Sequence, residues 1–130
     1  MRLRLAGLVF VLAAGLLGAA SGITGMWDGS MDLKSPDGEA LKWEVYAEFQ
    51  QAGKTVTGSA GPNVLQQYDI QRGVIEGSNL TFQVTIPGDP APIYRMKLTL
   101  VKSDRLEGTV EVQIGPDVKL AGKVTLTRNK

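Results

Sequence analysis

The segment LKWEVYAEFQ, residues 41–50, alternates between apolar and polar side chains along its whole length. Alternation with a period of two places the apolar side chains on one face of a β-strand, whereas a helix needs a spacing of about 3.6 residues. The odd-numbered residues from Leu41 to Phe49 therefore form a face that can be buried. The segment predicts a strand with one side toward a core and the other toward solvent.

The same period continues on both sides of this segment. Turn sequences such as Ser35-Pro36-Asp37-Gly38 separate the alternating stretches, because Pro fixes φ and Gly accepts a positive φ. We expect Gly61-Pro62-Asn63 to break the third strand, and Gly73 predicts a β-bulge in the fourth, with Val74 on its inward face. The strands are expected near residues 27–34, 41–50, 56–60, 64–75, 80–86, 94–100, 106–114 and 118–126.

Short strands that each carry one apolar face are typical of a β-sandwich or a β-barrel. The connections are short enough for each strand to pair with its neighbour in sequence, and closure of a barrel leaves no exposed edge. We therefore predict an all-β fold, an eight-stranded antiparallel up-and-down barrel, with an open sandwich as the alternative. The hairpin loops also predict the register of the last three strands, in which Met96 faces Val110, Arg95 faces Glu111, Val112 faces Leu120 and Gln113 faces Lys119.

The first 20 residues have the three parts of a signal peptide. Arg2 and Arg4 are followed by an uncharged apolar stretch and by the small residues Gly18, Ala19 and Ala20. The alternative is a permanent membrane anchor, but the apolar run of residues 5–20 is shorter than the roughly 20 residues that span a bilayer. We predict cleavage after Ala20, which leaves residues 21–130 as a single β-barrel domain, secreted or periplasmic and with no stable membrane anchor.

The composition argues against several classes of function. The chain has no His and no Cys, so the commonest general base, the commonest zinc ligand and thiol chemistry are all absent. Loss of Arg2 and Arg4 with the leader leaves 12 basic against 13 acidic side chains. A domain so close to neutral has no electrostatic footprint for nucleic acid.

Two short segments at the ends of the barrel domain resemble a known signature. Gly25-Met26-Trp27 opens the first strand and Leu126-Thr127-Arg128 closes the last. Together they resemble the calycin signature of lipocalins and avidin-like proteins. The resemblance implies that Trp27 plugs one end of the barrel, that Arg128 lies across its ring, and that Gly25, Trp27 and Arg128 are structural closure residues.

The avidin-like resemblance does not extend to biotin binding. Gly29-Ser30-Met31 is similar to the Gly-Ser stretch of that family, which would make Ser30 a contact to the biotin ureido group. A single residue separates Trp27 from Gly29, too few to form the biotin-contacting loop, and Ser30 has outward parity. We therefore expect no biotin site.

No residue pattern predicts catalysis. Glu44 and Glu48 share one face of the 41–50 strand, but four residues along a strand span about 13 Å, too far for a glycosidase pair. We interpret both as solvated surface. The chain also lacks phosphate-binding glycine motifs, so we predict a non-enzymatic protein with no catalytic residue, no metal site and no cofactor. Asn79-Leu80-Thr81 fits the N-glycosylation triplet, which matters only in a eukaryotic secretory pathway.

The interior of the barrel is the only plausible ligand site in the sequence. An eight-stranded barrel is just wide enough to be filled by its own side chains or to hold one small ligand. The many large inward residues favour filling, whereas the small ones among them, Gly108 included, leave room for a cavity. If a cavity exists, we expect it to be lined by Trp43, Tyr68, Tyr94 and Gly108.

Two functions follow from these alternatives. A filled barrel acts through its outer surface as a protein-binding, inhibitory or structural module, and this is the hypothesis that the sequence favours. A hollow barrel carries a small apolar ligand, which is the alternative. The expected partner is accordingly an unknown protein or a small apolar molecule.

Overall fold

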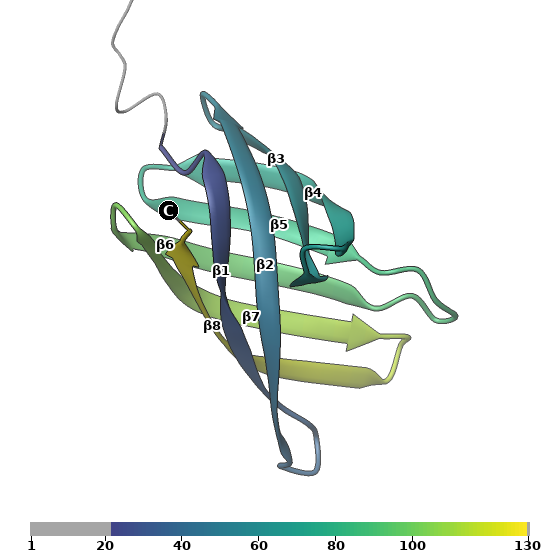
Figure 1. Ribbon diagram of the computed structural model, residues 1–130. Coiled ribbons are helices and arrows are strands. Elements are labelled where there is room, and N and C mark those ends of the chain that lie inside the picture. Colours follow the sequence, from purple (N-terminus) through teal and green to yellow (C-terminus); the bar gives the residue numbers. More distant parts are fainter. Residues whose placement is uncertain (1–21, 130) are drawn as a thin grey trace, which may run out of the picture.

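The strands follow one another around a closed antiparallel barrel in the computed structural model, which describes residues 22–129 (Figure 1). Each strand pairs with the next, and β8 pairs with β1, so the predicted up-and-down barrel is confirmed and the open sandwich is wrong. The predicted signal peptide, residues 1–20, lies outside the described residues and stays a prediction. The strands are β1 Gly25–Lys34, β2 Ala40–Ala52, β3 Thr55–Asn63, β4 Gln66–Glu76, β5 Asn79–Thr85, β6 Ile93–Lys102, β7 Arg105–Ile114 and β8 Val118–Arg128.

The register predicted for the last three strands is confirmed. Between β6 and β7, Met96 faces Val110 and Arg95 faces Glu111, and the Arg95 Nη1 and Glu111 Oε1 atoms lie 3.9 Å apart on the outer surface. The same match holds between β7 and β8, where Val112 faces Leu120 and Gln113 faces Lys119. Register is strongly specified here because a slip of one residue would turn every apolar side chain outward.

The end of β3 differs from the prediction. Gly61, Pro62 and Asn63 belong to the strand, and the turn falls on Val64 and Leu65 instead. Pro62 is tolerated because the pairing of β3 with β2 has already ended at Gly61, and a shift of register separates Ala60 from Asn63 on the β4 side. A proline that lacks a ladder partner removes no strand hydrogen bond.

The bulge predicted in β4 is confirmed, but the orientation of Val74 is wrong. The pairing of β4 with β5 shifts between Gln71 and Val74, and Arg72 has a positive φ of 56°. The extra residue reverses the alternation, so Val74 is 41% exposed and Ile75 is buried in its place. Ile70, before the bulge, still packs against the core as expected.

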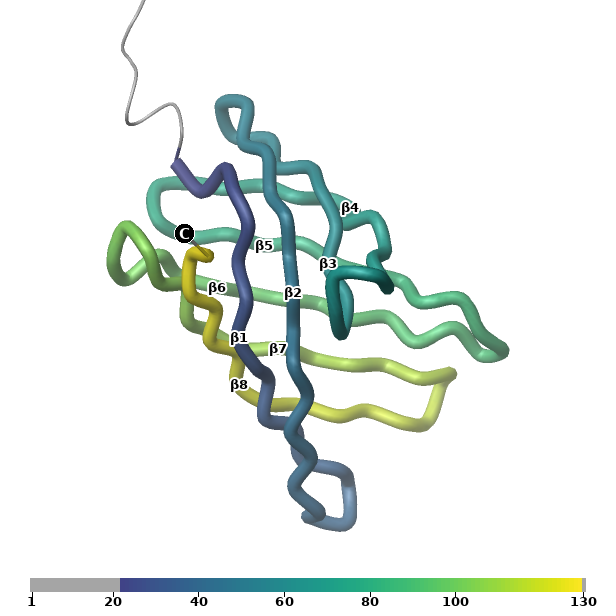
Figure 2. The backbone as a smooth tube through the Cα atoms, in the orientation of Figure 1, coloured from purple at the N-terminus to yellow at the C-terminus, as the bar shows by residue number. Residues whose placement is uncertain are grey.

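The smooth trace of the backbone shows that the barrel is not equally long on all sides (Figure 2). The β1–β2 hairpin extends well beyond the ends of β3 and β4, whereas the N-terminal part of β1 and the C-terminal part of β8 lie together at the opposite end. We call this second end, around Trp27 and Arg128, the closed end. The end where β2 begins and β5 finishes is the open end.

Gly108 has a structural role that differs from the one expected. It pairs with Leu98 of β6 and Val124 of β8, and a β-carbon at this position would overlap the carbonyl oxygen of Lys97. Glycine is therefore required because a neighbouring backbone approaches closely, not because the barrel has a void there.

Candidate ligand-binding site

The closed end of the barrel is sealed by an indole ring. Trp27 is 1% exposed, and its indole Nε1 donates a hydrogen bond of 2.9 Å to the carbonyl oxygen of Ile23, which is itself fully buried. A buried Trp that satisfies its N–H in this way combines a large apolar surface with no unpaired polar group. Ile23 precedes the first predicted strand, and no alternation signalled its burial.

Arg128 completes the seal from β8. Trp27 and Arg128 are direct partners in the β1–β8 ladder, and the guanidinium carbon lies 4.5 Å from the centroid of the Trp27 ring, within the distance of a cation–π contact. The guanidinium also donates to the carbonyl oxygens of Gly22 at 2.7 Å, Thr24 at 2.8 Å and Ser103 at 2.9 Å. One side chain thus joins the start of β1, the end of β8 and the β6–β7 loop.

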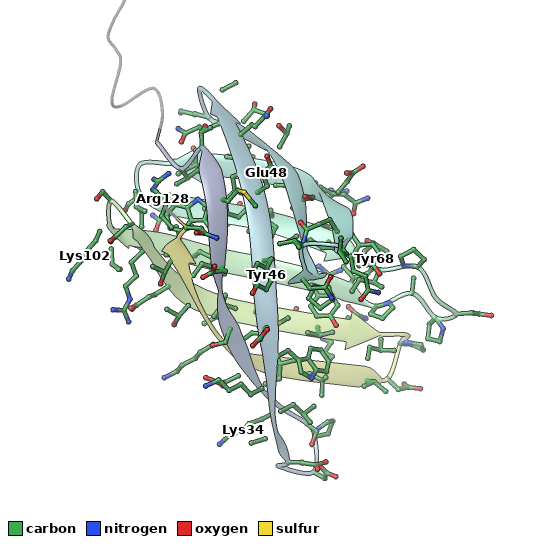
Figure 3. All side chains as sticks on the ribbon, viewed as in Figure 1. Lys34, Tyr46, Glu48, Tyr68, Lys102 and Arg128 are labelled. Carbon is green, nitrogen blue, oxygen red and sulfur yellow. The ribbon has the colours of Figure 1, made fainter. Side chains whose placement is uncertain are left out.

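Gly25 leaves the space that Arg128 occupies. Its φ of 138° disfavours an L side chain, and a β-carbon there would lie 3.3 Å from Nη1 of Arg128. Figure 3 shows the Arg128 side chain beside the beginning of β1, on the same end of the barrel as Lys102. The structure therefore brings Gly25, Trp27 and Arg128 together at one end.

The open end holds a pocket with a volume of about 320 Å³. Side chains from five strands line it, and most of them are apolar, with the charged residues Lys42 and Glu44 also among them. The apolar lining consists of Met31 from β1, Trp43 and Val45 from β2, Ala60 and Pro62 from β3, Val84 from β5 with Ile86 just after it, and Tyr94 and Met96 from β6. An apolar molecule would exchange water for carbon contacts here, which is favourable by about 25 cal/mol per Å² of buried surface.

Trp43 and Tyr94 form the aromatic part of the pocket. Their ring centroids lie 6.4 Å apart with the planes inclined at 50°. Trp43 is 38% exposed although it has inward parity, because the pairing of β2 with β3 has already ended at this point. Tyr94 is buried, and burial raises the pKa of its phenol above the ordinary value.

Two of the four predicted lining residues lie elsewhere. Tyr68 is half-buried on β4 and packs against the edge of the core, and it is not part of this pocket (Figure 3). Gly108 is also outside the pocket, at the close approach of β6 and β7. The sequence analysis identified Trp43 and Tyr94 but missed Met31, Ile86 and Met96. Inward parity shows that a side chain faces the barrel interior, but it does not show whether that part of the interior is packed core or pocket.

Glu44 and Glu48, the acidic pair on one face of β2, lie in different hollows of the structure. Glu44 lines the open-end pocket, whereas Glu48 lines a small separate hollow of about 50 Å³ on the outer face, beside Met26, Tyr46 and Val64. Among residues 22–129, no three acidic side chains come close enough together to hold a metal ion. No helix long and apolar enough to span a membrane occurs in this same part of the chain.

Comparison with known proteins supports the fold. No family model and no curated protein matches the chain. A protein of unknown function from the DUF3598 family of Nostoc punctiforme is 15% identical with a TM-score of 0.54, over 83% of this chain and 48% of that one, so the chain spans about half of its length. A redesigned β-barrel is 18% identical with a TM-score of 0.53, over 90% of this chain and 100% of that one. These similarities define the class, an eight-stranded β-barrel.

Proposed function

We propose that the protein is an exported, non-catalytic barrel that binds a small apolar molecule in the pocket at its open end. The observation that carries this proposal is the apolar pocket of about 320 Å³, lined by side chains from five strands. Ligand pockets in proteins are typically about 300–1,000 Å³, so this one suits a small ligand or the end of a longer one. Export rests on the leader pattern of residues 1–20.

Membership of the calycin-like barrels is part of the same proposal. It is supported by the cation–π contact of Arg128 with Trp27, which joins the last strand to the first. The division of the barrel into a sealed end and an open end also suits a carrier. Packing at the closed end holds the strands, and the pocket side chains are left free for a ligand.

Titration of the protein with an uncharged fluorescent probe, N-phenyl-1-naphthylamine, tests ligand binding. We expect saturable uptake at one site, with quenching of Trp43 fluorescence as the probe fills the pocket. Ala60→Leu places extra carbon atoms in the pocket, because Ala60 is buried and lines it, and should weaken uptake by about tenfold, the equivalent of 1.4 kcal/mol.

Ala121→Leu is the matched control. It adds the same atoms to an exposed position on β8 and should leave uptake unchanged. Absence of saturable uptake by the wild-type protein would contradict the proposed function, and equal weakening in the two variants would place the probe outside the pocket.

A further inference from the structure

The first half of β2 is paired on one side only. β2 pairs with β1 from Ala40 to Phe49, but its pairing with β3 begins at Tyr46. Residues 40–45 therefore have no strand partner on the side away from β1 among residues 22–129. We call this side of residues 40–45 the free edge; Figure 1 shows β2 running past the ends of β3 and β4 there.

The backbone groups of Lys42 and Glu44 point toward the free edge. The carbonyl oxygen of Tyr46 accepts a hydrogen bond of 3.3 Å from Nε2 of Gln67, which comes from the β3–β4 side. Within a strand, every second residue directs its N–H and C=O to the same neighbour. Glu44 and Lys42, two and four residues before Tyr46, thus present unpaired donors and acceptors on this side.

The last residues of β3 do not pair with these groups. Pro62 has no N–H to donate. The side chain of Asn63, the last residue of β3, is engaged with the turn instead, because its Oδ1 accepts hydrogen bonds from the backbone N–H of Leu65 at 2.9 Å and of Gln66 at 3.0 Å. Pairing of β2 with β3 stops at Tyr46 and Gly61, and the turn follows at Val64 and Leu65, so no strand pair forms opposite Glu44. A row of unpaired backbone groups of this kind is a template for another strand.

The free edge borders the mouth of the apolar pocket. Trp43 and Val45 face inward from the same residues of β2 and line the pocket, whereas the side chains of Lys42 and Glu44 are exposed. The side chains of an added strand would alternate in the same way. Its inward residues would meet carbon surface, and its outward residues would lie beside a cation and an anion.

We propose that the free edge binds an extended peptide segment of another protein as an additional antiparallel strand. The segment has an apolar residue opposite Trp43, an acidic residue opposite Lys42 and a basic residue opposite Glu44, so that it reads basic–apolar–acidic from its N-terminus. The backbone hydrogen bonds give affinity, and the pocket and the two charges give specificity. This inference goes beyond the proposed function and gives the outer-surface role a defined partner.

A capped hexapeptide, Leu-Lys-Phe-Glu-Val-Thr, spans the positions opposite residues 45 to 40 and is the probe for this interaction, measured by calorimetry with the protein. We expect it to bind the wild type and to displace N-phenyl-1-naphthylamine, since its Phe enters the pocket mouth. The same peptide with N-methyl groups on the amides that face β2 should bind about five- to tenfold more weakly, because each lost hydrogen bond is worth about 1 kcal/mol or more.

Two variants of one residue isolate the backbone of the free edge. Lys42→Pro removes an N–H that points away from β1, and such an edge position tolerates proline. Lys42→Ala keeps the N–H and removes the charge. We expect the Pro variant to lose about five- to tenfold in affinity for the peptide and the Ala variant to lose about twofold, with unfolding midpoints that show both to be folded.

Several results would overturn the inference. The first is that the peptide does not bind the wild type. The second is that the N-methylated peptide binds as tightly as the unmodified one, and the third is that Lys42→Pro and Lys42→Ala bind the peptide with equal affinity. Self-association of the wild type that Lys42→Pro abolishes would assign the free edge to a second copy of this chain instead. Titration of the wild-type protein with the naphthylamine probe alone separates the two proposals. Saturable uptake without peptide binding overturns only the edge interaction, and peptide binding without uptake overturns only the proposed function.

Discussion

The two tryptophans of this chain lie on neighbouring strands and have opposite environments. Trp27 at the closed end is 1% exposed, with its N–H bonded and a guanidinium over its ring. Trp43 at the open end is 38% exposed and faces a pocket. Both have inward parity, so parity decides which face a side chain lies on, but the surrounding strands decide whether it becomes core or binding surface.

The difference arises from where strand pairing stops. At the closed end, β8 reaches Trp27 through Arg128, and β2 pairs with both of its neighbours. At the open end, the pairing of β2 with β3 ends at Tyr46 and that of β4 with β5 ends at Ile70. The barrel is a complete cylinder near Trp27 and an incomplete one near Trp43.

The largest expected contrast comes from truncating each tryptophan. Trp27→Ala removes a fully buried ring and leaves a cavity, and should lower the free energy of unfolding by about 3–5 kcal/mol. Trp43→Ala removes a ring that is already partly in water and should cost about 1 kcal/mol or less. Urea unfolding of the two variants measures both values, and equal losses would contradict the division of the barrel into a packed end and an open end.

Arg128 is expected to have the next largest effect. Arg128→Ala removes the cation–π contact and leaves three backbone carbonyls without their charged donor, which should cost about 2–3 kcal/mol in unfolding free energy. Arg128→Lys should recover part of this, because an ammonium cannot stack on the ring as a plane.

Arg105→Ala serves as the comparison for Arg128. Arg105 lies on the surface beside Glu107 and should contribute less than about 0.5 kcal/mol. If the Arg128 variant lost no more than the Arg105 variant in urea unfolding, the closure of the barrel by Arg128 would be refuted.

At the open end, we expect Tyr94 to make a smaller contribution to the free energy of unfolding, and one that depends on pH. Burial raises the pKa of the Tyr94 phenol in the folded protein above its ordinary value of about 10, so the folded state keeps the phenol neutral where the unfolded chain ionises it. The stabilisation is full below about pH 10 and is lost as the pH rises through the folded pKa, and we expect the total loss to stay below about 1 kcal/mol. Tyr94→Phe should remove this slope from unfolding curves measured between about pH 9 and pH 11; an unchanged slope would assign the titration to another group.

The smallest effect on unfolding free energy is expected for the ion pair of Arg95 and Glu111 on the outer surface of β6 and β7. The Arg95 and Glu111 side chains lie 3.9 Å apart and are both largely exposed. Glu111→Gln should cost about 0.2–0.5 kcal/mol, reduced further by salt. A loss of several kcal/mol in denaturant unfolding would show that this surface ion pair stabilises the barrel as much as the packing at the closed end.

Much of the fold was predictable because the period of two is a local property of the chain. It predicts the eight strands and, together with the loop positions, the hairpin register around Glu111. The pairing of the first strand with the last was predicted from the short connections, because closure leaves no exposed edge. Val74 was misplaced because one residue with positive φ, Arg72, reverses all later alternation in β4, and parity counted along the sequence does not register it.

The candidate site was predictable only in part, for a different reason. Trp43 and Tyr94 were identified by their chemistry and parity, and both line the pocket. Gly108 was misinterpreted because a small inward residue has the same sequence signature whether it borders a void or the backbone of a neighbouring strand. Distinguishing these requires the distance between β6 and β7, which depends on the coiling of the whole barrel.

The contacts of Arg128 also constrain when the barrel can form. Its guanidinium binds the carbonyl oxygen of Gly22, 106 positions earlier in the chain, and the carbonyl oxygen of Thr24. Bringing such distant segments together carries a large loop-closure entropy, and folds rich in distant pairings form slowly. Until β8 has been synthesised, the edge of β1 away from β2 has no strand partner and the Trp27 ring lacks its contact with Arg128. Pairing of β1 with β8 therefore cannot form until the whole barrel domain has been synthesised.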